Sequence, residues 1–256
     1  VYNYLELREK LQTNGVTFKT TSDTEVILEL IRSKGISALQ DLNGMFAFAY
    51  WDESKDTFYL ARDRLGIKPL FYKETDNGIA FASEIKSLLV TSSDNEPQVN
   101  RELIDSYMSL GYCPSNDTLF EGIHKLAPGH FLGIKHGKVS IQQYWDMEFD
   151  KSQDLGEDYY IEETRRLFED SVKLQLRSDV PLGVFLSGGV DSSAVVAMMS
   201  KLGVKDIKTF SVAWDYGSEF DETKYARKIS EQYKTKANCL FYYFLLSFHH
   251  AYDIHL

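Results

Sequence analysis

The pattern of apolar and polar positions begins with two predicted helices. Residues 4–14 place three leucines at helical spacing among charged residues, and Gly15 follows as a stop signal. A second helix is predicted after residues 22–25, whose Ser-x-x-Glu pattern is that of a capping box, with each end residue bonding the other's backbone N–H. Gly35 supplies the C-terminal stop of this helix.

A strand-rich stretch follows the two helices. Residues 45–51 are almost wholly apolar and aromatic, which predicts a strand buried on both faces. Five further strands are predicted at 57–61, 70–73, 79–82, 130–135 and 138–145. Short strands at close spacing are typical of antiparallel sheets, so this part of the chain is predicted to be a domain of mixed helices and sheets.

The pattern changes after residue 145. Residues 146–158 are polar and lack periodicity, so we expect a domain boundary there, with a first domain at 1–148 and a second at 159–256. The second domain is predicted to contain helices at 159–176, 194–199 and 222–232 and buried strands at 180–186 and 207–212. A strand, a glycine-rich turn, a helix and another strand form the start of a parallel α/β sheet.

Composition narrows the classes of function. The 256 residues carry a formal net charge of −10, and an acidic surface without a basic stripe argues against a nucleic-acid partner. Two cysteines offer no disulfide framework, which fits a reducing, cytoplasmic location. The longest apolar run, 239–248, is too short to cross a bilayer, so no membrane partner is expected. The six histidines show no metal-ligand spacing, and the group at His249, His250 and His255 lies in the tail.

The strongest chemical signal lies between a predicted strand and a predicted helix, at residues 186–193. Gly188 and Gly189 allow the main chain to approach an anion closely, and the N-terminus of the following helix supplies positive potential for phosphate. Ser187 and Ser192 add hydroxyl groups. No lysine follows the glycines, so the loop differs from the Walker type that serves γ-phosphate chemistry.

An acidic residue in this loop needs a reason, because a carboxylate repels phosphate. Asp191 is explained if it binds Mg²⁺ that also contacts phosphate oxygens. The alternative is a turn capped by Asp191 or Ser192 that binds nothing. The strand, two glycines, several hydroxyls and the acid occurring together favour the phosphate loop.

The Ser-Gly-Gly-x-Asp-Ser loop resembles that of the ATP-pyrophosphatases, and residues 176–186, 209–212, 220–222 and 225–227 resemble the synthetase domain of asparagine synthetases. The resemblance implies ATP and Mg²⁺ as cofactors. It also implies an α/β parallel-sheet domain of the adenine nucleotide alpha hydrolase-like type. The loop would hold pyrophosphate and its metal through Ser187, Gly188, Gly189, Asp191 and Ser192, while Leu186 and Val212 would line the adenosine.

The first half resembles the class II glutamine amidotransferase domain through the runs 2–8, 22–25, 42–48, 61–70, 82–88 and 120–123. The implied fold is the α+β sandwich of Ntn hydrolases, with layers in the order αββα. Asp23 matches the carboxylate that holds the ammonium group of glutamine in that family. The simpler interpretation is that the negative charge of Asp23 stabilises the helix N-terminus, and this role is compatible with glutamine binding.

The resemblance also implies what this sequence lacks. The family's nucleophile is an N-terminal Cys activated by its own α-amino group, whereas this chain starts at Val1 and both of its cysteines are internal. Residues 1–3 match the positions just after the family's oxyanion segment. We therefore expect a fragment that lacks both ends and carries no catalytic nucleophile. After residue 236 the resemblance ends, and the apolar run 238–248 is expected to be exposed.

The charged residues Arg62, Asp63, Arg64 and Lys68 have two interpretations, a solvated hairpin loop or a set of structural ion pairs. The resemblance as a whole implies a cytoplasmic ligase of asparagine biosynthesis, in which glutamine supplies ammonia and ATP activates aspartate as an acyl adenylate. A homodimer is an assembly that the resemblance allows. Two alternatives stay open: amidation of another carboxylate, on a surface polysaccharide or a secondary metabolite, and a non-catalytic nucleotide-binding remnant.

Overall fold

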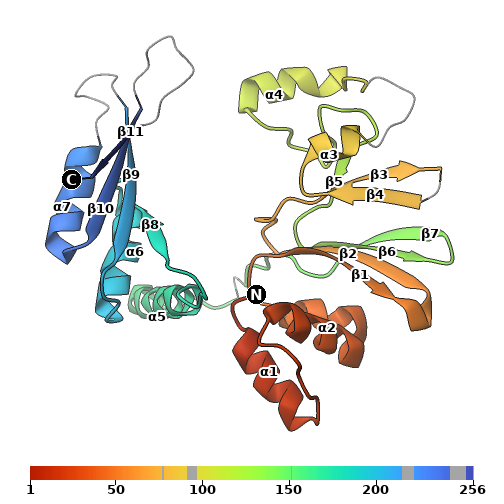
Figure 1. The fold of residues 1–256 in the computed structure, drawn as a ribbon, viewed down its shortest axis with the longest axis horizontal. Helices are drawn as coiled ribbons and strands as arrows, with labels where there is room; N and C mark the ends of the chain where they lie inside the picture. The colour runs from red at the N-terminus through yellow and green to blue at the C-terminus, as the bar shows by residue number, and fades with distance from the viewer. Residues whose placement is uncertain (77, 91–96, 151, 215–221, 243–251, 256) are drawn as a thin grey trace. The chain divides into compact units, whose positions relative to one another are not determined.

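The computed structural model describes residues 1–76, 78–90, 97–150, 152–214, 222–242 and 252–255. It divides into two compact units, Val1–Asp150 and Lys151–Leu256. The first unit runs from red to green in Figure 1, and the second is blue-green to blue. Each unit has its own buried core, as expected for a domain.

Two helices open the first unit. Helix α1 (Tyr4–Thr13) and helix α2 (Asp23–Lys34) lie close to their predicted positions, and α2 ends at Gly35, which has a φ of 68°. Helix α2 starts with Ser22, whose hydroxyl accepts a hydrogen bond from the Thr24 N–H at 3.1 Å. The predicted bond from the Ser22 N–H to the Glu25 side chain is wrong. Glu25 instead accepts from backbone N–H groups of the preceding loop, as described below.

Two antiparallel sheets follow. The first has the order β1-β2-β6-β7 and comprises β1 (Ala47–Asp52), β2 (Thr57–Arg62), β6 (His130–Lys135) and β7 (Lys138–Gln143). The second has the order β4-β3-β5 and comprises β3 (Phe71–Thr75), β4 (Gly78–Ala82) and β5 (His124–Lys125). Short hairpins between neighbouring strands make both sheets antiparallel.

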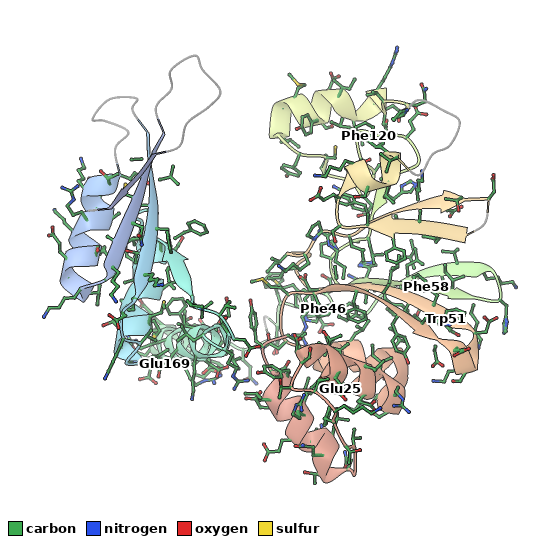
Figure 2. All side chains as sticks on the ribbon, in the orientation of Figure 1. Glu25, Phe46, Trp51, Phe58, Phe120 and Glu169 are labelled. Atoms are coloured by element: carbon green, nitrogen blue, oxygen red, sulfur yellow. The ribbon has the colours of Figure 1, made fainter. Side chains whose placement is uncertain are left out.

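Two cores define the layers of this unit. The larger core joins α1 and α2 to the first sheet, with Leu30 and Leu39 fully buried near Phe46. The smaller core lies on the other side of that sheet and includes Leu60 and Leu132, with Phe58 packed against it (Figure 2). Helices, sheet and second sheet therefore follow in sequence, which agrees with the predicted α+β sandwich. Each large side chain fully buried in these cores contributes roughly 1.5–3 kcal/mol relative to exposure.

Strand β1 corrects one prediction. Its residues alternate between half-buried and exposed, and Trp51 is 54% exposed, so the strand is not buried on both faces. On one face Phe48 and Tyr50 pack against the larger core, whereas on the other face Ala47 packs against the smaller core and Ala49 and Trp51 are exposed.

Several short elements were not predicted: η1 (Gly35–Asp41), η2 (Glu53–Lys55), α3 (Ile85–Leu89), η3 (Arg101–Leu103), α4 (Ile104–Leu110) and the two-residue strand β5. Helix α3 contacts β3 and β4, on the second sheet. Helices of five to seven residues span one or two turns and carry too few positions for a periodic pattern to be recognised.

The second unit contains a four-stranded sheet with the order β11-β10-β9-β8. Its elements are α5 (Glu157–Gln175), β8 (Gly183–Phe185), α6 (Val190–Lys201), β9 (Lys208–Trp214), α7 (Thr223–Tyr233), β10 (Lys236–Tyr242) and β11 (Tyr252–His255). Strands β8, β9 and β10 are parallel, while β11 runs antiparallel to β10. The predicted strand–helix–strand start of a parallel α/β sheet is therefore confirmed.

Two predictions for the second unit need correction. The strand predicted at 180–186 is only three residues long, and Phe185 at its end is 82% exposed rather than buried. Part of the tail predicted to be exposed forms β10, which pairs in register with β9, and Cys239 within it is buried. Residues 243–251, including His249 and His250, lie outside the described residues. Among the residues that the structure describes, no helix is long and apolar enough to span a bilayer.

Candidate functional site

The first candidate site is the N-terminus of α2, which carries Asp23. The helix is fixed there from two sides. Ser22 caps it, and Glu25 holds the preceding loop by accepting from the N–H groups of Lys19 and Thr20 at 2.8 and 2.6 Å. The bond from Lys19, with further bonds from Thr20, holds the pKa of Glu25 below its usual value. The first turn of α2 is therefore a firm support for Asp23.

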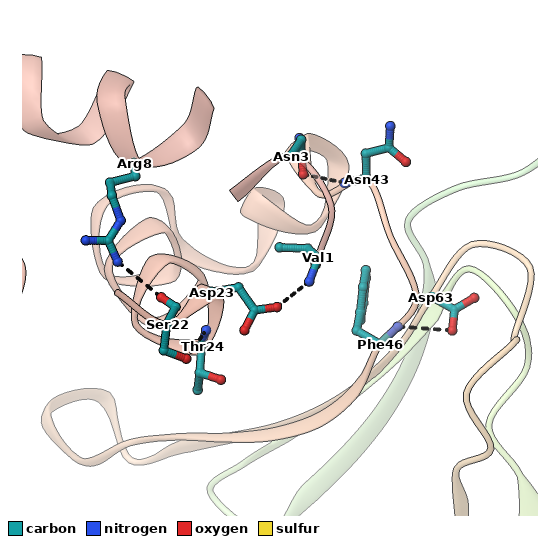
Figure 3. A network of polar contacts seen from close by, with 9 residues as sticks. All are labelled: Val1, Asn3, Arg8, Ser22, Asp23, Thr24, Asn43, Phe46 and Asp63. Atoms are coloured by element: carbon teal, nitrogen blue, oxygen red, sulfur yellow. Dashed lines mark hydrogen bonds and ion pairs between the residues drawn. The ribbon is translucent and has the colours of Figure 1, made fainter. Parts of the chain in front are cut away.

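The carboxylate of Asp23 lies beside the first residue of the described chain. It forms an ion pair with the α-ammonium of Val1, as Figure 3 shows. Asn3 fixes the segment that carries this ammonium, because its side chain donates to the Asp41 carbonyl at 2.8 Å and accepts from the Asn43 N–H at 3.0 Å.

Asp23 lies at a cavity of about 400 Å³. Its walls come from α2, from β1 with the residues before it, and from the segment that contains Lys68 and Pro69; the lining residues are Val1, Asp23, Thr24, Ile27, Leu28, Ile31, Met45, Phe46, Ala47, Phe48, Ala49, Tyr50, Lys68, Pro69 and Ser83. The cavity is mostly apolar with a few polar groups, which is typical of a small-molecule site.

The loop after β2 carries the charged residues that were expected to be either solvated or ion-paired, and the structure shows a third arrangement for two of them. Asp63 is only 1% exposed, and its two carboxylate oxygens accept from four backbone N–H groups at 2.9–3.2 Å. The guanidinium of Arg62 donates to the carbonyls of Gly66, Lys68 and Leu126 at 2.6–2.8 Å. Arg62 and Asp63 thus bind main-chain atoms, whereas Leu65 and Ile67 in the same loop are exposed to solvent.

The surroundings of Arg62 show that its guanidinium is partly buried. Burial lowers the pKa of the Arg62 guanidinium, and the nearby Asp63 carboxylate opposes this shift. The Tyr144 hydroxyl donates to the Arg62 carbonyl at 2.8 Å, and burial raises the pKa of that phenol well above its usual value. Gly66 has a φ of 65°, and a Cβ there would lie 2.8 Å from Pro128, so the turn needs glycine.

The second candidate site is the loop between β8 and α6 in the second unit. The chain leaves β8 at Leu186, whose N–H donates to the Phe210 carbonyl at 2.8 Å and whose carbonyl accepts from the Ser211 hydroxyl at 2.6 Å. The loop then closes on itself. Ser187 accepts from the Gly189 N–H at 3.2 Å, and the hydroxyls of Ser187 and Ser192 lie 3.2 Å apart.

Gly188 lies against helix α7 with no room for a side chain. Its φ is 84°, and a Cβ would be 2.4 Å from the Tyr225 Cβ and 2.5 Å from the Ala226 nitrogen. The first turn of α7 therefore packs directly on the loop backbone. Only glycine combines this contact with a left-handed conformation.

Helix α6 begins immediately after the loop, with Gly189 at its N-cap and no side-chain hydrogen bond capping it. The first N–H groups of an α-helix have no acceptor inside the helix, so this end is suited to an anion. The Ser193 hydroxyl in the same turn is buried and finds no partner among the described residues.

The predicted metal ligand and adenosine residues lie as follows. Asp191 is exposed in the first turn of α6, and no cluster of three potential metal ligands occurs among the described residues. A Mg²⁺ ion here would take one carboxylate and fill its shell with phosphate oxygens and water, as is common for this ion. Val212 is 47% exposed, whereas the Leu186 side chain is 2% exposed and packs against Val196 and Ala226, so only its main chain faces the loop.

Two features of these sites were not predicted from the sequence: the burial of Asp63 and the contribution of Lys68 to the cavity wall. Nothing in the sequence separates Asp63 or Lys68 from ordinary surface charges, because their positions depend on contacts between distant segments.

Comparison with known proteins identifies the family to which this chain belongs. The sequence matches a family model described as a glutamine amidotransferase domain over residues 1–145 and one described as asparagine synthase over residues 163–243. Asparagine synthetase [glutamine-hydrolyzing] 1 of Bacillus subtilis is 41% identical over 227 residues, which cover 88% of this chain and 35% of that protein.

Two further relatives show the same pattern of coverage. A putative asparagine synthetase [glutamine-hydrolyzing] 2 of Methanocaldococcus jannaschii is 36% identical over 95% of this chain and 47% of its own length. Amidase chry2 of Gibberella zeae is 36% identical over 90% of this chain and 36% of its own length. The chain thus spans less than half the length of the relatives it matches. With two family models matched in the order of its two structural units, the chain belongs to the glutamine-hydrolysing asparagine synthetase family.

Proposed function

We propose that this chain takes part in the ATP-dependent amidation of aspartate, with glutamine as the source of ammonia. The observation that carries the proposal is the loop between β8 and α6, where a glycine backbone, an uncapped helix end and the hydroxyls of Ser187 and Ser192 come together. These features fit the triphosphate of ATP, because phosphate oxygens accept from all of them.

In this proposal the loop holds the pyrophosphate part of ATP. The N–H groups at the start of α6 and the hydroxyls of Ser187 and Ser192 face the phosphates, while Asp191 holds Mg²⁺. Bound Mg²⁺ would neutralise charge on the phosphates. Val212 and the main chain of Leu186 lie against the adenosine. The carboxylate of aspartate attacks the α-phosphate, pyrophosphate leaves, and ammonia then displaces AMP from the acyl adenylate.

The first unit would bind glutamine through Asp23. A carboxylate suits the ammonium group of an amino acid, and the cavity of about 400 Å³ beside Asp23 is large enough for one. No cysteine lies near this cavity among the residues that line it. Hydrolysis of glutamine therefore needs a nucleophile that these residues do not supply. The predicted cytoplasmic location and homodimer stay predictions.

A second candidate is amidation of a different carboxylate by the same adenylation chemistry. One relative carries the name amidase rather than asparagine synthetase, although its identity to this chain is similar. The loop and the cavity would be unchanged in this case, because they bind ATP and glutamine rather than the acceptor.

The test is nucleotide product analysis with Mg-ATP, aspartate and ammonium. We expect AMP and pyrophosphate, dependent on aspartate, and loss of both in Asp191→Asn. Formation of ADP and phosphate would contradict attack at the α-phosphate. A folded protein that binds ATP but gives no product would rule out aspartate and favour another carboxylate acceptor.

A further inference from the structure

The carboxylate of Asp63 joins chain segments that are distant in sequence. Its Oδ2 atom accepts from the N–H groups of Phe46 and Lys68 at 3.2 and 2.9 Å, and its Oδ1 atom accepts from those of Leu65 and Ile67 at 3.2 and 2.9 Å. The Asp63 N–H in turn donates to the Phe46 carbonyl at 2.8 Å. One buried carboxylate thus fixes both the start of the β1 segment and the loop after β2.

Both segments line the cavity at Asp23. Phe46 belongs to the wall that continues into β1, and Lys68 with Pro69 forms another part of the wall. Figure 3 shows Asp63 bonded to the Phe46 nitrogen, with Asp23 and the Val1 ammonium in the same region. Asp63 itself does not line the cavity. Its influence on a ligand therefore passes through the two wall segments.

We propose that Asp63 is a positioning residue for the ligand cavity at Asp23, because a single carboxylate oxygen holds two of its wall segments at a fixed separation. This proposal rests on the proposed binding of glutamine at Asp23. A neutral side chain of the same shape is unable to replace Asp63, since asparagine offers one acceptor oxygen and one donor nitrogen to four N–H groups.

Either orientation of asparagine would loosen the wall. With its oxygen on the Phe46 side, the Ile67 N–H faces a donor; with its oxygen on the Ile67 side, the N–H groups of Phe46 and Lys68 do. Ile67 and Lys68 are neighbours in the chain, so the segment that carries Lys68 loses a bond in both cases. A shift of roughly 1 Å in a binding site is enough to lower its performance by about 100-fold.

The first measurement is amide hydrogen exchange on the whole chain, without ligand. In the wild-type protein we expect the amides of Phe46, Ile67 and Lys68 to be protected. In Asp63→Asn at least one of them should exchange about tenfold faster or more, while the β2–β6 pair at Leu60 keeps its protection. Unprotected amides at these three positions in the wild type would overturn the proposal without any variant.

The second measurement is the Kd for glutamine by NMR titration. We expect Asp63→Asn to raise the Kd by between about 10- and 100-fold. The control is Asp105→Asn, which removes an exposed carboxylate from α4 of the same unit and should leave the Kd unchanged.

The outcomes separate this proposal from the function on which it rests. If the wild type binds glutamine and Asp63→Asn binds it equally well, the positioning role is wrong. If the wild type does not bind glutamine, the function assigned to Asp23 is wrong, and hydrogen exchange alone decides whether Asp63 fixes the two walls. If Asp63→Asn fails to fold, glutamine should still slow exchange at Phe46 and Lys68 in the wild type, and unchanged exchange there would refute the role.

Discussion

Replacing Gly188 by alanine probes the contact between the phosphate loop and helix α7. Two free-energy costs of the substitution add at this position, one from backbone strain and one from steric overlap with α7. A residue with a Cβ at a φ of 84° costs about 1–2 kcal/mol. A Cβ placed 2.4 Å from the Tyr225 Cβ and 2.5 Å from the Ala226 nitrogen forces the helix away, at a cost typical of overpacking, about 1–3 kcal/mol. Gly188→Ala should therefore destabilise the second unit by roughly 2–5 kcal/mol.

Gly203→Ala is the matched control in the same unit. Gly203 has a φ of 80°, almost the same as Gly188, but a Cβ there would meet nothing within 4 Å. This substitution should lower the stability only through backbone strain, by about 1–2 kcal/mol. The difference between the two variants thus isolates the contact with α7.

The assay is the free energy of opening from amide hydrogen exchange at β9, in the centre of the second unit's sheet. We expect Gly188→Ala to lower it by at least about 1 kcal/mol more than Gly203→Ala does. Equal losses in the two variants would refute the claim that α7 packs directly on the loop. A larger loss in Gly203→Ala would refute the assignment of strain to Gly188 altogether.

Two further predictions concern hydrogen bonds outside the phosphate loop. Glu25→Gln should destabilise the first unit at neutral pH; because the pKa of Glu25 is depressed below 4.5 in the folded state, the stability it contributes is complete above pH 4.5 and is lost as the pH falls through the depressed value. Urea unfolding at several pH values measures this, and a difference between wild type and variant that persists in strong acid would contradict the assignment. Thr235→Val should cost about 1–3 kcal/mol, because the hydroxyls of Thr209 and Ser230, both buried, lie 2.9 and 2.7 Å from the Thr235 hydroxyl and would lose that partner. Thr13→Val, at the exposed end of α1, is its control, and equal effects in urea unfolding would refute the reasoning.

Local patterns in the sequence were sufficient for elements whose signals lie within one segment. Helix α2 was predicted from Ser22 at its start and Gly35 at its end, and the structure places both residues at those positions. The phosphate loop was predicted from two glycines and the serines around them, and it lies between β8 and α6 as expected. These signals depend on residues within a few positions of each other.

Contacts between distant segments were beyond these patterns. Arg62 and Asp63 look like surface charges because the partners that bury them, Phe46 and Leu126, lie 17 and 64 residues away in the chain. Only the folded chain shows that the donors and acceptors of these two residues are main-chain groups. The same argument applies to the Thr209–Thr235 contact, which joins β9 to the residue just before β10.

Strand burial was also misjudged where it depends on position within the sheet. The aromatic run of β1 has the composition of a central strand, but β1 lies at the sheet edge. Strand β10 was taken for an exposed tail, although its parallel pairing with β9 gives it seven partners in register. Composition alone does not distinguish the centre of a sheet from its edge.

The central claim is that the loop between β8 and α6 binds ATP with its metal. Isothermal titration of the chain with Mg-ATP tests it most directly, using Asp191→Asn and, as a charge-matched control, Asp170→Asn on the exposed surface of α5. We predict saturable binding by the wild type and by the control, and a Kd raised by about tenfold or more in Asp191→Asn, which corresponds to the loss of one charge-assisted contact of about 1.5–3 kcal/mol. No binding by the folded wild type, or equal binding by all three proteins, would contradict the claim.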